Sequence, residues 1–160
     1  MATSTILAAV LAVGGAVVTG SPGAEKQPVE TPEHQVVAIY FHRTQRCPTC
    51  KRIGAMAEQA VTQGFEKEAN APIVAFRFVD FQDGKNAKIV QSYGVDAPTL
   101  VLVNVFAGEA ASWTNLPKVW QLVGRPDDFR AYVREGVARY RKQSREEAEL
   151  EHEEAKESNR

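Results

Sequence analysis

The feature that most constrains this sequence is a pair of cysteines placed between an apolar run and an amphipathic pattern. The run from Val36 to Phe41 is continuous and rich in β-branched and aromatic residues, as expected of a strand buried on both faces. Cys47 follows it by six residues, and Cys50 completes a Cys-Pro-Thr-Cys segment. From Ile53 onward, apolar residues recur at steps of three and four, which predicts a helix beginning near the cysteines.

The rest of the chain continues this alternation of strand and helix patterns. Further strands are predicted at Ile73 to Phe81, Thr99 to Phe106 and Ala111 to Thr114, and further helices at Lys85 to Tyr93, Leu116 to Val123 and from Pro126 to Tyr140. Two helix-linked crossovers imply parallel strands, and the last two strands form an antiparallel hairpin. The predicted fold class is therefore α/β, with a mixed central sheet and helices on both faces.

Both ends of the chain differ in composition from the domain, which we place at residues 35–141. The apolar run from Ile6 to Val18 is too short to span a bilayer comfortably and is followed by small residues, so residues 1–22 are predicted to be a signal peptide or an N-terminal anchor. Residues 23–34 resemble a linker, and residues 142–160 a charged helical or disordered tail that faces solvent. We expect an exported protein, periplasmic or otherwise extracytoplasmic, with the N-terminal segment cleaved or kept as a membrane anchor.

Charge and cysteine content exclude several classes of function. A formal net charge of -1 provides no long-range field for binding nucleic acid. The chain has only 2 cysteines, which excludes a framework of several disulfides. A bridge across so short a span would stabilise the fold very little, because it closes a very small loop. Redox chemistry or metal binding explains the pair better.

The position of Cys47 at the start of a helix favours redox chemistry. Free backbone N–H groups and the positive end of the helix dipole stabilise a thiolate there. Arg46 and Lys51, like the nearby Arg43 and Arg52, are expected to lower the pKa of the thiol further, and no acidic residue lies among them. Cys47 is thus the predicted nucleophile, and Cys50, one turn into the helix, the predicted resolving thiol.

Metal binding is the alternative that the residues leave open. The cysteine pair could form half of a zinc site, but the other candidate ligands are only His34, His42 and His152. Of these, His42 is near enough in sequence for a Cys-Cys-His site that carries copper or zinc. Thiol–disulfide exchange itself requires neither a metal nor another cofactor.

Two motifs together resemble the thioredoxin superfamily, and in particular its exported bacterial members. One is the strand, CxxC and helix succession; the other is Gly94-Val95-Asp96-Ala97-Pro98-Thr99-Leu100, which leads into a strand. The resemblance covers about residues 36–140 and implies a thioredoxin-like fold. It also implies that the Pro98 loop lies against the CxxC motif, that Ala97 and Pro98 contact the substrate chain, and that the Ala97–Pro98 bond is cis.

The sequence departs from that family at two places. Reductases of the family commonly have a tryptophan before the first cysteine and a buried acid in the preceding strand, where this chain has Arg46 and the pair Tyr40-Phe41. Without the carboxylate, proton transfer at Cys50 needs another base or water. We therefore expect a specialised thiol–disulfide oxidoreductase acting on protein disulfides or dithiols, with a membrane protein as electron-transfer partner. A metal carrier and a catalytically quiet adaptor are the alternatives.

Overall fold

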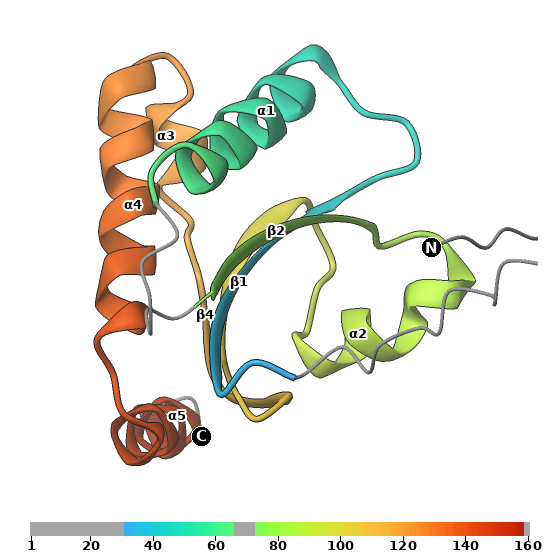
Figure 1. Cartoon of the computed structure of the whole chain (residues 1–160). Coiled ribbons are helices and arrows are strands. Elements are labelled where there is room, and N and C mark those ends of the chain that lie inside the picture. Colours follow the sequence, from blue (N-terminus) through green and yellow to red (C-terminus); the bar gives the residue numbers. More distant parts are fainter. Residues whose placement is uncertain (1–30, 66–72, 159–160) are drawn as a thin grey trace, which may run out of the picture. The chain divides into compact units, whose positions relative to one another are not determined.

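The computed structural model describes residues 31–65 and 73–158, and strands and helices alternate along them (Figure 1). The elements are β1 (His34–His42), α1 (Pro48–Thr62), β2 (Ile73–Asp80), a short 3-10 helix (Gly84–Asn86), α2 (Ala87–Ser92), β3 (Thr99–Phe106), β4 (Glu109–Asn115), α3 (Val119–Leu122), α4 (Pro126–Arg141) and α5 (Arg145–Ser158). Every strand and helix expected between residues 36 and 140 has a counterpart. The bounds differ by only a few residues.

The strands form one mixed sheet in the order β2-β1-β3-β4. β1 and β2 are parallel, whereas β3 is antiparallel to both β1 and β4. The prediction that both crossovers join parallel strands is therefore wrong for the second one. The 6 residues of α2 cover about 9 Å, whereas the 8 residues of β2 cover about 26 Å. Because α2 is too short to carry the chain back along the length of the sheet, β3 begins near the end of β2 and runs in the opposite direction.

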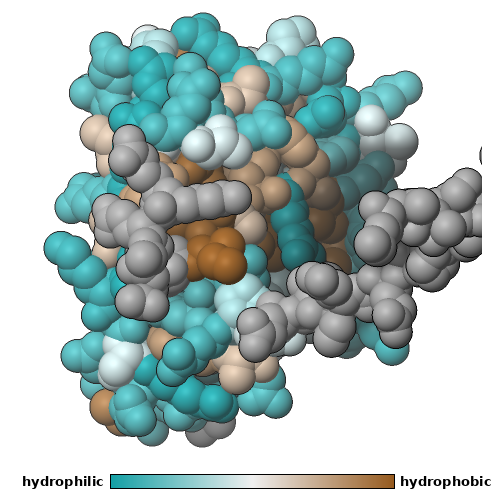
Figure 2. Space-filling view, viewed as in Figure 1, coloured by the Kyte–Doolittle hydropathy of each residue, from teal (hydrophilic) through white to brown (hydrophobic). Residues whose placement is uncertain are grey.

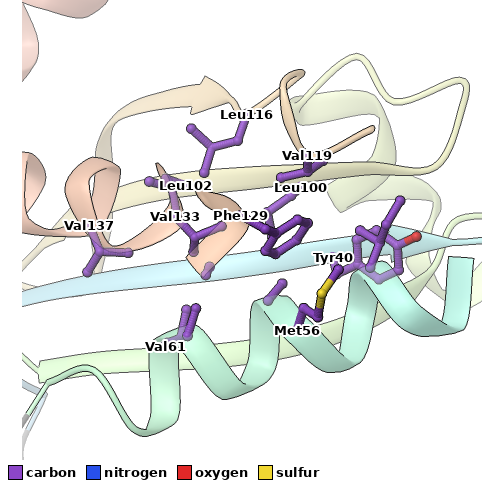
Figure 3. Packing of buried hydrophobic residues seen from close by; sticks show 14 of the residues in the cluster. Tyr40, Met56, Val61, Leu100, Leu102, Leu116, Val119, Phe129, Val133 and Val137 are labelled. Atoms are coloured by element: carbon purple, nitrogen blue, oxygen red, sulfur yellow. The ribbon is translucent and has the colours of Figure 1, made fainter. Parts of the chain in front are cut away.

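Each face of the sheet has its own hydrophobic core. On one face, β1 and β3 pack against α1, α3 and α4, and Figure 3 shows Val61, Phe129 and Val137 within this cluster. On the other face, Phe41 and Val101 are buried among residues of and around α2, including Ile89, Val90 and Tyr93. The predicted mixed sheet with helices on both faces is confirmed. The order of elements and the position of the cysteine pair make this a thioredoxin-like α/β fold.

Turn chemistry explains how two of these elements end. Gly94 follows α2 with a φ of 59°, the left-handed conformation that glycine adopts without steric cost. The β3–β4 hairpin turns at Ala107 (φ 50°) and Gly108 (φ 85°), and positive φ at both positions matches the twist of a two-residue hairpin. The turn at Gly94 ends α2 shortly before Pro98 and β3, and the turn at Ala107-Gly108 ends β3.

The acidic segment near the C-terminus differs from the expected solvent-facing tail. It forms α5, which packs against β4 and buries Ala148 completely. A buried Asn104 on β3 joins this helix to the sheet: its amide nitrogen donates to Gln143 Oε1 at 2.9 Å, and its amide oxygen accepts from His34 Nε2 at 2.7 Å. Gln143 in turn donates to Glu151 of α5. The charge pattern predicted a helical or disordered tail, and it did not indicate the buried amide that anchors the helix.

The predicted signal segment at residues 1–22 lies outside the described residues, as does most of the predicted linker at 23–34. Both remain predictions. Within the described part of the chain, no helix is long and apolar enough to cross a membrane.

Candidate functional site

Cys47 caps the N-terminus of α1 and is joined to Cys50 by a disulfide. Its backbone is extended (φ -66°, ψ 161°), and its Sγ accepts a hydrogen bond from the Cys50 N–H at 3.1 Å. Pro48 occupies the first helical turn, where its missing N–H donor is not needed. The two Cα atoms are 5.1 Å apart, within the usual span of a disulfide. The sequence thus places the pair at a helix N-terminus as predicted.

The two sulfurs differ in access to solvent. Cys47 is exposed, whereas Cys50 is half-buried. A partner's sulfur can approach Cys47 from solvent, while Cys50 is reached most directly from Cys47 itself. This asymmetry is the one that a nucleophile and a resolving thiol require.

The segment that carries the chain from β1 to Cys47 is tied to the end of β2. The Thr44 N–H donates to Gln82 Oε1 at 3.1 Å, and the Gln82 N–H donates to Asp80 Oδ1 at 2.9 Å. A hydrogen bond from the Thr44 side chain, followed by the one from Gln82, holds the pKa of the Asp80 carboxyl below its ordinary value. The parallel pairing of β1 with β2 therefore supports the cysteine loop from one side.

A cationic and aromatic surface adjoins the disulfide. Arg46 is half-buried and lies over the Phe78 ring, with its guanidinium carbon 5.1 Å from the ring centroid. Phe78 stays 39% exposed although it is a large apolar residue. It belongs to the edge strand β2, over which Figure 2 shows an apolar band framed by hydrophilic surface. Lys51 is exposed on the first turn of α1.

The Pro98 loop reaches the same edge of the sheet as the cysteine loop, because Thr99 pairs with Phe41 near the end of β1. The expected cis Ala97–Pro98 bond is wrong: among the described residues every peptide bond is trans. A trans proline is compatible with this place because a residue just before a strand needs no ladder donor. The Pro98 carbonyl accepts a hydrogen bond from Trp120 Nε1 at 3.2 Å. Substrate contact by Ala97 and Pro98 stays a prediction.

Three aromatic residues of this region were not singled out as site residues by the sequence. Phe78 and Trp120 are each 39% exposed, and Tyr40 is completely buried beneath α1. Burial raises the pKa of Tyr40 to about 12, so the hydroxyl stays protonated at neutral pH. In the sequence, Tyr40 is only one residue of the apolar run that forms β1. Its alternation with Phe41 on β1 could have indicated that it faces α1 and not α2.

The metal-binding alternative finds no support in the described residues. The ring of His42 lies edge-on to Phe78, with centroids 6.1 Å apart, and its Nδ1–H donates to the Arg43 carbonyl at 2.9 Å. Nowhere in residues 31–65 and 73–158 do three or more histidine, cysteine or acidic side chains form a group able to hold a metal ion.

Comparison with known proteins finds distant structural likenesses but no sequence relative. No family model matches the sequence, and no curated protein matches it. The crystal structure of thioredoxin O2 from Arabidopsis thaliana in the oxidized state is 19% identical, covers 59% of this chain and 74% of its own, and superposes with a TM-score of 0.37. A likeness at this level carries no inference about activity, so the thioredoxin-like fold rests on the chain's own topology and on its Cys47–Cys50 disulfide.

Proposed function

We propose that this protein is a thiol–disulfide oxidoreductase that exchanges disulfides with other proteins through Cys47 and Cys50. One observation carries the proposal: an exposed cysteine caps α1 and forms a disulfide with a less exposed cysteine one turn later. A helix N-terminus with cationic neighbours stabilises the thiolate that such exchange requires. A stabilising role would not account for the disulfide, because it closes a loop of very few residues.

In the reducing direction, the Cys47 thiolate attacks one sulfur of a target disulfide. The new bond joins Cys47 to the target, and the second target sulfur leaves with the electron pair and takes a proton from water. Cys50, after losing its proton, attacks Cys47 Sγ, closes the internal disulfide and releases the first target sulfur as a thiolate. Two electrons pass from the protein to the target. The oxidising direction is the reverse sequence, beginning with attack of a target thiolate on Cys47.

We infer that the oxidising or isomerising direction is favoured. Groups that stabilise the Cys47 thiolate stabilise the reduced protein, which makes its disulfide a better oxidant. Arg46, Lys51 and the end of the α1 dipole all act in this sense. Equilibration with glutathione measures the preference directly, and a potential as low as that of a general reductase would contradict it.

The partners that we propose are exported proteins and a membrane protein that exchanges electrons with the pair. This part rests on the apolar run from Ile6 to Val18, which resembles a signal peptide. Fusion of residues 1–34 to a reporter that is active only after export tests it. Retention of the reporter in the cytoplasm would remove the proposal of exported partners while leaving the exchange chemistry untouched.

Trapping of mixed disulfides tests the exchange chemistry. The Cys50→Ser variant lacks the resolving thiol, so target proteins should accumulate as reducible adducts on Cys47. The matched variant Cys47→Ser keeps one thiol on the same helical turn but removes the proposed nucleophile. We expect many adducts with the first variant and few with the second. Equal trapping by both, or no adducts and no reversible disulfide in the wild-type protein, would favour the catalytically quiet adaptor.

A further inference from the structure

The hydroxyl of Tyr40 is buried and has no hydrogen-bond partner among the described residues. The residue is 0% exposed, and its Oη is one of the few buried side-chain polar atoms left without a protein partner. Buried polar groups in native proteins are almost always paired, so an unpaired one calls for a physical explanation.

Two interactions locate this hydroxyl beneath the first turns of α1. The Tyr40 ring lies against Gly54, where an added Cβ would be 3.1 Å from both Cδ1 and Cε1 of the ring. Gly54 follows Cys50 by one helical turn and therefore lies on the same side of α1. At the other end, Arg46, which precedes the disulfide, acts electrostatically on the Tyr40 hydroxyl. Cys50 lies between these two positions along the chain.

The direction of the side chain agrees with this location. Figure 3 shows the Tyr40 ring beside α1, beyond Met56, with the hydroxyl oxygen toward the N-terminal half of the helix. Phe78 packs edge-on against the ring at 6.3 Å between centroids and separates it from solvent on the β2 side. The half-buried Cys50 is thus the redox sulfur on the same side of the helix as the hydroxyl.

We propose that Tyr40 Oη donates a hydrogen bond to Cys50 Sγ when the disulfide is reduced. The inference rests on the exchange function proposed above and names the group that serves the resolving sulfur. In the disulfide, Cys50 Sγ is uncharged and a weak acceptor, whereas the thiolate is a strong one. Reduction therefore gives the unpaired hydroxyl a partner. Because burial raises the pKa of Tyr40 to about 12, the residue is a donor and not a base at neutral pH.

This hydrogen bond has a defined part in the exchange cycle. Tyr40 keeps its proton throughout, and the proton of the Cys50 thiol passes to water. The electron pair of the Cys50 thiolate then forms the bond to Cys47 Sγ, and the hydrogen bond weakens as the charge leaves. Tyr40 thus favours ionisation of Cys50 and stabilises the reduced protein relative to the disulfide, in the same sense as the cationic residues around Cys47.

The test compares Tyr40→Phe with Tyr140→Phe in the full chain. Tyr140 is a matched control because it too is 0% exposed and burial raises its pKa to about 12. It lies at the C-terminal end of α4, away from the cysteines. Equilibration with glutathione at a pH high enough to ionise Cys50 should show the Tyr40→Phe disulfide about tenfold harder to reduce, the effect of one hydrogen bond to a charged group. Tyr140→Phe should match the wild type.

A variant with a single thiol allows the pKa of Cys50 to be measured in the absence of disulfide exchange. In Cys47→Ser only the Cys50 thiol remains, and its pKa should rise by about one unit when Tyr40→Phe is added. An unchanged Cys50 pKa, or an equal rise with Tyr140→Phe, overturns the inference. Neither result bears on mixed-disulfide trapping by Cys50→Ser, so failure of the inference and failure of the proposed function are distinguishable.

A measurement on the wild-type chain covers the case in which Tyr40→Phe does not fold. With tyrosine labelled at Cζ, the carbon resonance of Tyr40 should shift when the disulfide is reduced, because its hydroxyl gains an acceptor. The resonance of Tyr140 should stay in place. A Tyr40 resonance that does not respond to reduction contradicts the proposal.

Discussion

The two ends of the β1 strand differ in how their polar groups are used. At its start, His34 joins a chain of side-chain hydrogen bonds through Asn104 and Gln143 to α5. At its end, the chain passes to an exposed disulfide beside a half-exposed Phe78 and above the unpaired hydroxyl of Tyr40. The first end holds the fold together, and the second leaves groups free for chemistry. Substitutions at the two ends should therefore separate stability from redox behaviour.

The largest effect on stability is expected from Asn104→Ala at the α5 end. Removing the buried amide takes hydrogen bonds away from its half-buried partners His34 and Gln143 and should cost about 2–3 kcal/mol of unfolding free energy, measured by urea unfolding. The control Asn115→Ala removes an exposed amide from β4 and should change little. The glutathione equilibrium of folded Asn104→Ala should equal that of the wild type. A shifted equilibrium would show that the two ends are coupled.

Gly54→Ala should affect both properties, because Gly54 is where α1 approaches the sheet beneath the disulfide. The new Cβ would lie 2.8 Å from Phe78 Cε1 and 3.1 Å from the Tyr40 ring. Displacement of these rings, partly offset by the better helix propensity of alanine, should cost about 1–2 kcal/mol. We expect the redox equilibrium to shift as well.

The matched control for that prediction is Gly136→Ala on α4. There the added Cβ would be 2.9 Å from Leu102 Cδ1, the far end of a flexible side chain. This variant should lose some stability in urea but keep the wild-type redox equilibrium. If both alanine variants shift the equilibrium equally, contact with Tyr40 and Phe78 is not what matters at position 54.

A smaller effect is expected from Arg46→Gln. Loss of the half-buried positive charge should raise the pKa of Cys47 in the reduced protein by about half a unit to one unit, measured by thiolate absorbance. Salt should shrink the difference from the wild type, since it screens partly exposed charges. Arg52→Gln, which removes an exposed charge further along α1, should shift the pKa less. An equal shift would indicate a general effect of net charge.

The smallest effect concerns Asp80, which supports the cysteine loop from the end of β2. Because its interactions hold the folded-state pKa below the ordinary value, they stabilise the protein above about pH 4. That contribution is lost as the pH falls through the folded-state pKa. Thermal unfolding of Asp80→Asn and of the wild type should thus differ at neutral pH and converge in acid. Asp96→Asn is an exposed control of equal charge change, and an equal effect there would indicate a general effect of net charge.

Much of the fold could be predicted because local patterns and packing agree. The apolar run of β1 and the stripe of α1 each specify one element, and Pro126 with its acidic neighbours specifies the start of α4. The direction of β3 could not be predicted in this way. It depends on how far α2 carries the chain, and the pattern from Lys85 to Tyr93 did not show that only Ala87–Ser92 would be α-helical.

The candidate site was predicted where it depends on neighbours in sequence. Cys47, Pro48 and Cys50 lie within one helical turn, so their spacing alone indicates a helix-capping pair. The conformation of the Ala97–Pro98 bond was predicted wrongly because a motif, and not a packing argument, suggested it. Phe78 and Trp120 were missed as surface residues because exposure depends on which strand lies at the edge and which loop covers it.

The sequence by itself determined the positions of the helices and strands, the helix-capping cysteine pair and the cationic residues around it. Those properties follow from periodicity and from backbone groups at a helix N-terminus, which need no distant partner. The tertiary structure alone decided that β3 is antiparallel, that Asn104 anchors α5, and that the Tyr40 hydroxyl is buried under α1 with no partner in the described part of the chain. The direction of β3 depends on how far α2 carries the chain. The other two depend on burial by residues far away in the chain, which a local pattern does not contain.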